Sequence, residues 1–146
     1  MVVVTLDGLD EQGDKSVIAT TPAELDGALN RLRLLSRGRP VLAEASVENP
    51  MAVLSIGVHG DRGVLYYSGA DHVEGAFSTG DSGSDVPEIL YYYMGSDTSF
   101  PPNSEIPIEA VRQAAHEFMT TGQRPTGVQW QPRPAQTGPV ESEWPL

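Results

Sequence analysis

Apolar residues recur in steps of three and four in two stretches of the chain, which predicts amphipathic helices near residues 22–36 and 107–121. Thr21, Pro22 and Glu24 supply a start for the first helix, with threonine as N-cap and glutamate in the position of a capping box. The apolar faces comprise Leu25, Ala28, Leu29, Leu32 and Leu35 in the first helix and Ile108, Val111, Ala115, Phe118 and Met119 in the second. Each helix is therefore expected to bury one face.

Glycine and proline mark the ends of both helices. Gly38 and Pro40 follow the first one, and Gly122 and Pro125 follow the second. Gly122 can adopt a left-handed backbone conformation at no steric cost, and Pro125 has no amide hydrogen with which to extend a helix. Four arginines gather near the end of the first helix: Arg31, Arg33, Arg37 and Arg39. They balance the helix dipole there, and an anion site is the alternative interpretation.

Between the helices, β-branched and aromatic runs alternate with turn residues, which predicts an antiparallel meander. Residues 2–6 and 16–20 are expected to pair as an opening hairpin, and residues 60–63 (Gly-Asp-Arg-Gly) to form a tight turn. The central strands are expected at residues 41–47, 52–59, 63–67 and 89–93. Residues 68–87 are rich in glycine, serine and aspartate, so a long connection is expected there.

A last strand is expected after the second helix, where Val128 and Trp130 lie two positions apart and therefore face the same side. Trp130 is expected to anchor this strand against the helix. Together these elements predict an α+β fold, an antiparallel sheet of about five to seven strands with two helices packed on it. Residues 1–131 are expected to form a single domain, and the proline-rich residues 132–146 an extended or disordered tail.

Composition narrows the possible functions. The 146 residues include 20 acidic and 9 basic side chains, for a net charge of −11, and no cysteine. The lack of cysteine excludes disulfides, thiol nucleophiles and thiolate zinc sites, and no cofactor or metal is predicted. The excess of acids argues against direct binding of nucleic acid and favours a basic partner. The N-terminus lacks the pattern of a signal peptide or membrane span, so a cytoplasmic protein is expected, with its oligomeric state left open.

Acidic residues dominate the centre of the chain, because residues 63–111 contain no lysine or arginine. The eight acids in this stretch are Asp71, Glu74, Asp81, Asp85, Glu88, Asp97, Glu105 and Glu109. A solvated acidic face explains them most simply. An electrostatic docking surface is the alternative, since acids attract a basic partner over long range.

Three consecutive tyrosines, Tyr91, Tyr92 and Tyr93, lie on one of the predicted strands. The outer two share a face, so at least one tyrosine is expected in the core, most simply packed under a helix. Tyrosine is also common at protein interfaces, and this run directly follows the acidic residues 81–88. The run is therefore also a candidate contact with a partner.

The spacing E-F-x-x-T-G-x-R-P-x-x-V-x-W resembles the signature of the first-numbered Imm family of bacterial immunity proteins. It is carried by Glu117, Phe118, Thr121, Gly122, Arg124, Pro125, Val128 and Trp130. Residues 55–67 (SIGVHGDRGVLYY) and the run FPPNSEIPIEAV into the second helix also look like that family, so the likeness covers residues 51–131. The signature residues themselves are explained by helix capping, turning and core packing.

This resemblance implies an α+β protein without catalytic residues that binds and silences a cognate toxin, commonly a nucleic-acid deaminase. Such toxins must attract polyanions, so an acidic inhibitor suits their basic grooves. The candidate partner-binding residues are accordingly Asp71, Glu74, Asp81, Asp85, Glu88, Tyr91, Tyr92 and Tyr93. The alternative function is an acidic scaffold or regulatory module whose partner is not a toxin.

Two short motifs resemble parts of enzyme sites. Residues 80–83 (GDSG) match the surroundings of a serine protease nucleophile, and residues 72–74 (HVE) match half of the zinc deaminase signature. The chain is much shorter than a double-barrel protease, and the cysteines of the deaminase motif are missing. A hydrolase would instead need a deep pocket lined by two carboxylates, or by His59 with neighbouring acids.

Overall fold

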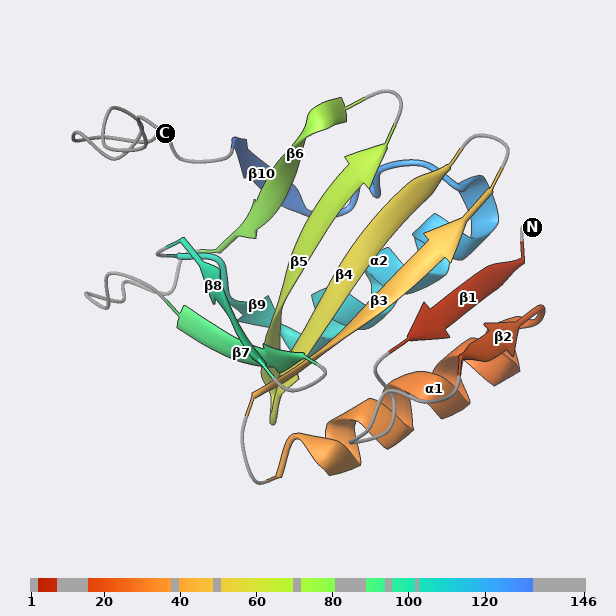
Figure 1. The fold of residues 1–146 in the computed structure, drawn as a ribbon, viewed down its shortest axis with the longest axis horizontal. Coiled ribbons are helices and arrows are strands. Elements are labelled where there is room, and N and C mark those ends of the chain that lie inside the picture. The colour runs from red at the N-terminus through yellow and green to blue at the C-terminus, as the bar shows by residue number, and fades with distance from the viewer. Residues whose placement is uncertain are drawn as a thin grey trace, which may run out of the picture.

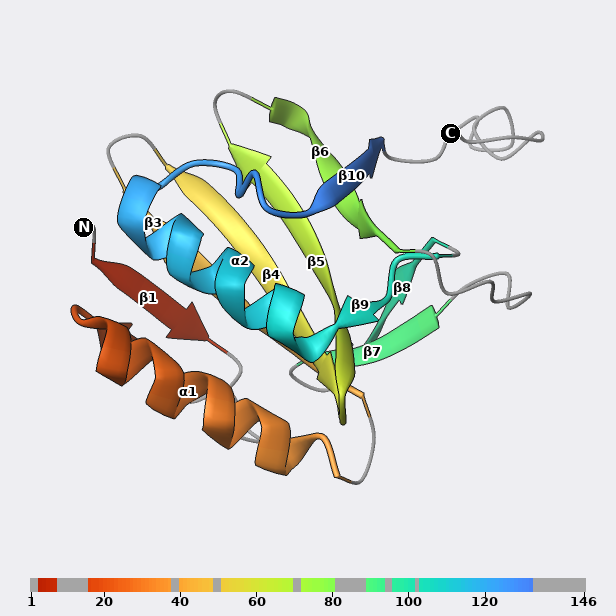
Figure 2. The ribbon, with the colours of Figure 1, turned by 180° about the vertical axis from the view of Figure 1, so that it is seen from behind.

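The computed structural model describes residues 3–7, 16–37, 40–48, 51–69, 72–80, 89–93, 96–101 and 103–132. In these residues two helices cover one face of a ten-stranded sheet (Figures 1 and 2), which confirms the predicted α+β class. The elements are β1 (Val4–Asp7), β2 (Val17–Ala19), α1 (Pro22–Leu35), β3 (Val41–Val47), β4 (Ala52–His59), β5 (Arg62–Gly69), β6 (His72–Thr79), β7 (Ile89–Tyr93), β8 (Ser96–Phe100), β9 (Ile106–Pro107), α2 (Ile108–Thr121) and β10 (Gln129–Pro132). The tail expected at residues 132–146 lies outside this range except for Pro132.

Most of the sheet follows a single antiparallel path in the order β10-β6-β5-β4-β3-β1-β2. The opening hairpin is confirmed as β1 and β2, and the predicted meander is confirmed for β3, β4 and β5 but is wrong for residues 89–93, which lie off the main path of the sheet. β7 pairs antiparallel with β8 and touches β3 through one parallel pair, Val41 and Tyr92. β9 is a short partner of β5. None of the helices in the described residues is long and apolar enough to cross a membrane.

The long connection predicted at residues 68–87 is wrong for its central part, because β6 runs there. β6 has hydrogen-bonded neighbours on both sides, β5 and β10. Pairing on both edges outweighs the weak strand propensity of its glycine and serine residues. Gly75 has a positive φ of 79°, and the pairing with β5 shifts register between Tyr67 and Gly69. Residues 70–71 and 81–88 lie outside the described part of the chain.

Local chemistry fixes the start of α1. Thr21 is the N-cap, and its hydroxyl accepts the Glu24 amide at 3.2 Å. The Glu24 carboxylate reaches back past the N-cap and accepts from the amide and the hydroxyl of Thr20, both at 2.8 Å. This reciprocal pair differs from a capping box by one residue. The apolar face packs as predicted, with Leu25, Ala28, Leu29 and Leu32 buried and Leu35 partly buried against the core.

The end of α2 also follows the sequence prediction. Gly122 adopts φ 69° and its amide donates to the Phe118 carbonyl at 2.7 Å. The chain then turns into β10, where the Trp130 indole donates to the Pro125 carbonyl at 2.8 Å and the Arg124 guanidinium lies 5.8 Å from the ring centroid. Val128 and Trp130 both pack against the main core, which confirms that they share a face.

Two separate cores lie on opposite faces of the sheet. The larger one fills the space between the sheet and both helices. The smaller one consists of Leu42, Val64, Tyr91 and Phe100, with Tyr66 and Phe77 packed against it. Side chains alternate between faces along a strand, so this second cluster belongs to the helix-free face, where the β7–β8 hairpin covers one end. Tyr91 is a core residue as expected, but for this tyrosine the expected packing under a helix is wrong.

Candidate functional site

Most of the partner-binding residues proposed from sequence have no described side chain. Asp71, Asp81, Asp85 and Glu88 lie outside the described residues. The backbones of Glu74, Tyr92 and Tyr93 belong to β6 and β7, the two strands that flank residues 81–88 in the chain. Tyr91 is the exception, because its side chain is described and is fully buried.

Tyr91 organises a polar cluster beneath the β4–β5 turn. Its hydroxyl donates to Glu105 Oε2 at 2.9 Å, and burial, together with the Glu105 carboxylate, raises the pKa of the tyrosine strongly. His59 Nδ1 lies 3.4 Å from the same oxygen, and Arg62 Nη1 lies 3.6 Å from Oε1. His59 and Arg62 are half exposed, whereas Glu105 is 14% exposed. The buried Tyr91 thus fixes the carboxylate of Glu105, which in turn holds the side chains of His59 and Arg62 at the surface.

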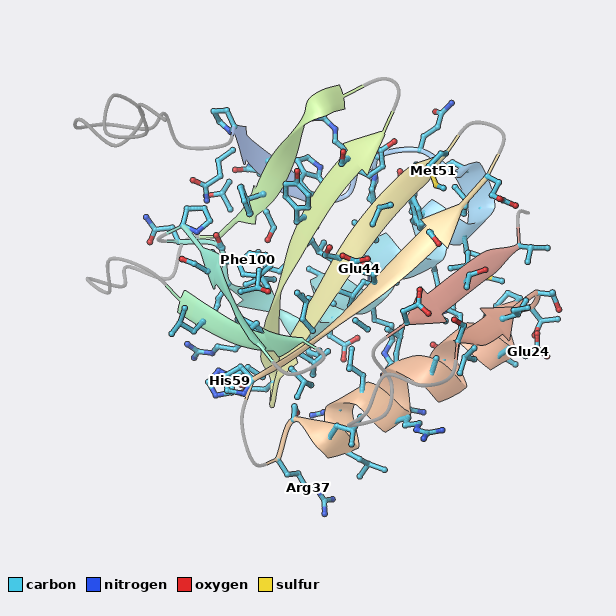
Figure 3. The ribbon with its side chains drawn as sticks, in the orientation of Figure 1. Glu24, Arg37, Glu44, Met51, His59 and Phe100 are labelled. Atoms are coloured by element: carbon cyan, nitrogen blue, oxygen red, sulfur yellow. The ribbon has the colours of Figure 1, made fainter. Side chains whose placement is uncertain are left out.

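The helix-free sheet face carries a cross-strand row of mainly polar side chains. Strand register aligns six residues from six neighbouring strands, and for the three on β3, β4 and β5 both flanking residues belong to the helix-covered core. From one side of the sheet to the other, the row is Asp7, Glu44, Ser55, Tyr66, Phe77 and Gln131. Figure 1 looks onto this face, and Figure 3 shows Glu44 over its middle. In the part of the chain that the structure describes, no helix covers the row.

Two carboxylates stand side by side in this row, since Asp7 on β1 is the register partner of Glu44 on β3. Both side chains are partly buried. Burial raises the pKa of Glu44, and the neighbouring Asp7 raises it further. The Asp7 carboxylate also accepts a hydrogen bond from the Ser16 hydroxyl. Like charges directly opposite on neighbouring strands destabilise a sheet, so this pair is maintained at a cost to the free protein.

Sequence inspection missed both members of this pair, although Glu44 left a signal. It is the one charged residue in the run Val-Leu-Ala-Glu-Ala-Ser-Val of β3. When apolar residues bury one face of a strand, an acid among them lies on the opposite face. That face is then expected to be exposed to solvent or to have a function. Asp7 has no such signal, because it ends its strand and reads as a turn residue.

A groove of about 1080 Å³ lies where the end of α1 meets the β4–β5 turn. Its walls come from two separate parts of the chain, residues 30–40 and 59–62. The lining residues are Asn30, Arg33, Leu34, Ser36, Arg37, Pro40, His59, Gly60, Asp61 and Arg62. Figure 3 shows Arg37 and His59 at this end of the molecule. The groove combines cationic side chains with a small apolar wall.

The hydroxyl of Ser36 in this groove has a structural role. Among the described residues that line it, Ser36 alone carries a hydroxyl. That hydroxyl donates to the Arg33 carbonyl at 2.6 Å and accepts the Gly60 amide at 3.3 Å, so it ties the end of α1 to the β4–β5 turn. The described histidine, aspartate and glutamate side chains do not form a group of three or more suited to a metal ion.

Comparison with known proteins gives a clear family match. The family model described as Immunity protein Imm1 matches residues 13–132, which covers both helices and all strands from β2 to β10. A search of curated proteins found no match to the chain.

Proposed function

The chain belongs to the Imm1 family of immunity proteins, which act against toxins, and from this premise we propose that it neutralises a cognate toxin by occluding its active site. The inhibitor acts by binding rather than by catalysis. A nucleic-acid deaminase is the proposed toxin, because an enzyme that attracts a polyanion needs a basic groove and this chain carries a net charge of −11. The encounter is placed in the cytoplasm, where such a toxin finds its substrate.

The single observation that supports an acidic docking face is the Asp7–Glu44 pair on the helix-free side of the sheet. Two adjacent carboxylates, one with a raised pKa, repel each other in the free protein. A lysine or arginine of a bound toxin relieves that repulsion. The pair therefore lowers the stability of the free protein but strengthens binding of the toxin. The acidic and tyrosine-bearing residues 71–93 extend this surface in the proposal, with Tyr92 and Tyr93 as the contact tyrosines.

The experiment measures inhibition and affinity with the toxin domain encoded beside the immunity gene. We expect wild type to copurify with this toxin and to inhibit it. The double substitution Asp7→Asn and Glu44→Gln is expected to weaken binding by about ten-fold and to reduce its salt dependence. Replacement of Asp81, Asp85 and Glu88 by serine is expected to act in the same direction.

Glu109→Gln is the matched control, because Glu109 is an exposed acid of α2 on the helix-covered side of the sheet. It removes one negative charge and should leave affinity within about two-fold of wild type. Equal affinity for wild type and the Asp7/Glu44 variant at low salt would place the interface elsewhere. Absence of any toxin binding by wild type would refute the function itself.

A further inference from the structure

The groove at the end of α1 concentrates positive charge in a strongly acidic protein. Arg33 and Arg37 enter it from α1 and its C-terminal turn, and His59 and Arg62 enter it from the β4–β5 turn. Three of the nine basic residues of the chain therefore line one groove. A partner that contacted only acidic surfaces of the protein would leave these arginines without an anionic partner.

Compensation of the α1 dipole explains only part of this arrangement. Cations near the last turn of a helix stabilise it, which accounts for Arg33 and Arg37. Arg62 and His59 belong to a hairpin on the other side of the groove, which meets the N-terminus of α2, where a helix dipole does not favour cations. Their position over the groove is fixed by Glu105, itself held by the buried Tyr91. Two unrelated elements thus present cationic or protonatable groups to the same space.

Two of the groove arginines, Arg33 and Arg37, differ from Arg112 and Arg124. Arg112 is committed to Asp26 at 2.8 Å, and Arg124 stacks over Trp130. Within the described residues, neither Arg33 nor Arg37 forms an ion pair with a carboxylate, and both are exposed. These two guanidinium groups are therefore available to an incoming anion.

The size and walls of the groove indicate what kind of anion fits. About 1080 Å³ is far more than one inorganic ion fills, and Leu34, which is 58% exposed, and Pro40 add apolar surface beside the arginines. A peptide segment with carboxylate and apolar side chains matches both features, since the planar arginine fork pairs with carboxylates in two parallel hydrogen bonds. A nucleic acid fits less well, because its extended negative charge meets the exposed Asp61 and the net charge of −11.

We propose that this groove binds a carboxylate-bearing segment of the toxin. In the complex, acidic residues of the immunity protein then contact basic residues of the toxin, and arginines of the groove contact carboxylates of the toxin. The inference rests on the proposed function and adds a second contact to it. An acidic face that docks a basic groove sets no unique orientation, whereas an additional contact of opposite polarity fixes the register of the complex.

The first test compares toxin affinity among charge-reversed variants. Arg33→Glu together with Arg37→Glu is expected to weaken binding by about ten-fold or more. Arg31→Glu is the matched control, because Arg31 is an exposed residue of the same helix that does not line the groove, and it should change affinity by less than about three-fold. Circular dichroism and thermal melting verify that both variants remain folded.

The outcomes separate the two proposals. Undiminished toxin binding by the Arg33/Arg37 variant overturns the groove inference and leaves the proposed function intact. Equal losses in the Arg31 control and the groove variant also overturn it, because the effect would then reflect net charge alone. If wild type does not bind the toxin at all, both proposals fail.

A second test measures the chemical preference of the groove without the toxin. Amide chemical shifts of the protein are followed by NMR during titration with a short acetylated peptide of alternating glutamate and leucine. We expect shifts in residues 33–37 and 59–62 that are lost in the Arg33/Arg37 variant. A peptide with glutamine in place of glutamate, inorganic phosphate and a single-stranded oligothymidine are the comparison probes. No shifts, equal shifts with the glutamine peptide, or shifts with phosphate or oligothymidine alone would overturn the carboxylate assignment.

Discussion

The carboxylate of Glu117 on α2 accepts two hydrogen bonds from Thr126, one from its amide and one from its hydroxyl, both at 2.8 Å. It also accepts the Gly127 amide at 3.2 Å. A side chain from the last turns of the helix thereby organises the segment that leads into β10. Glu117, the first residue of the motif that ends at Trp130, thus holds the turn between the helix and the strand of that motif.

Replacing Glu117 with glutamine should destabilise the protein by about 1–2 kcal/mol. Glutamine keeps one acceptor oxygen but loses the charge and the second acceptor, so the donors of Thr126 and Gly127 are only partly satisfied. Urea denaturation at neutral pH measures the difference in the free energy of unfolding. Glu48→Gln is the control, since Glu48 is exposed after β3, and it should change stability by less than about 0.5 kcal/mol.

The effect of Glu117 should depend on pH in a defined direction. Burial raises the pKa of this carboxyl, but the hydrogen bonds from Thr126 and Gly127 outweigh it and hold the pKa below its usual value. The stabilisation is therefore complete above the unfolded pKa of about 4.3 and is lost as the pH falls through the lower folded pKa. A gap between wild type and Glu117→Gln that widens in acid would contradict this assignment.

Local chemistry made this region predictable from sequence. Gly122, Pro125 and the pair Val128 and Trp130 each obey a rule that involves only neighbouring residues, and all are found as expected. Glu117 was recognised only as part of the signature, because its hydrogen bonds reach 9 and 10 residues along the chain. Contacts of that kind have no sequence periodicity.

The bridge between the two helices should contribute modestly and depend on salt. Asp26 on α1 accepts from His116 Nε2 and Arg112 Nη1 on α2, both at 2.8 Å. Hydrogen bonds from His116 and then Arg112 lower the pKa of Asp26. Asp26→Asn should cost about 0.5–1 kcal/mol at low salt, a range that already allows for screening of this partly exposed pair.

Guanidinium denaturation would mask this salt dependence, so urea titrations at low and high NaCl are the appropriate measurement. The difference between wild type and Asp26→Asn should shrink at about 1 M NaCl, where the screening length is about 3 Å. It should also shrink as the pH falls through the lowered pKa of Asp26, where wild type loses the carboxylate charge. A difference that is unchanged by both salt and acid would show that Asp26 acts through packing alone.

Gly57 should be intolerant of even one added carbon. A Cβ there would lie 2.6 Å from Val64 Cγ2 and 2.7 Å from Tyr91 Cδ2, inside the second core. Gly57→Ala should therefore destabilise the protein by about 1–3 kcal/mol through overpacking. Gly27→Ala is the opposite case, since a Cβ added to Gly27 within α1 would meet no atom within 4 Å, and it should stabilise by roughly 0.5–1 kcal/mol.

Thermal melting of both alanine variants checks this pair. Equal effects in the two variants would argue against close packing of β7 on the sheet.

The second core was not predictable from sequence, because it depends on β7 and β8 folding back over the helix-free face. The residues that meet there, Leu42, Val64, Tyr91 and Phe100, come from four strands. The groove escaped prediction because two parts of the chain that are distant in sequence line it, although the arginines on its α1 side were recognised as a possible anion site.

The Asp7–Glu44 pair leads to a prediction that separates stability from function. Burial and the neighbouring Asp7 raise the pKa of Glu44, so the folded state binds its proton more tightly than the unfolded state. This carboxyl therefore supports folding below the unfolded pKa of about 4.3, and that advantage is lost as the pH rises through the higher folded pKa. At neutral pH Glu44→Gln should stabilise the free protein by about 0.2–1 kcal/mol, the range for opposed side chains on neighbouring strands.

The same substitution should weaken toxin binding, because it removes the charge that a basic partner would neutralise. Denaturation curves from acidic to neutral pH and affinity measurements on the same preparations test the two effects together. A variant that is more stable and binds less well identifies Glu44 as a residue retained for recognition at the expense of the fold. A variant that is less stable at neutral pH would show that Glu44 is a structural residue, and one that is more stable but binds equally well would remove Glu44 from the docking face.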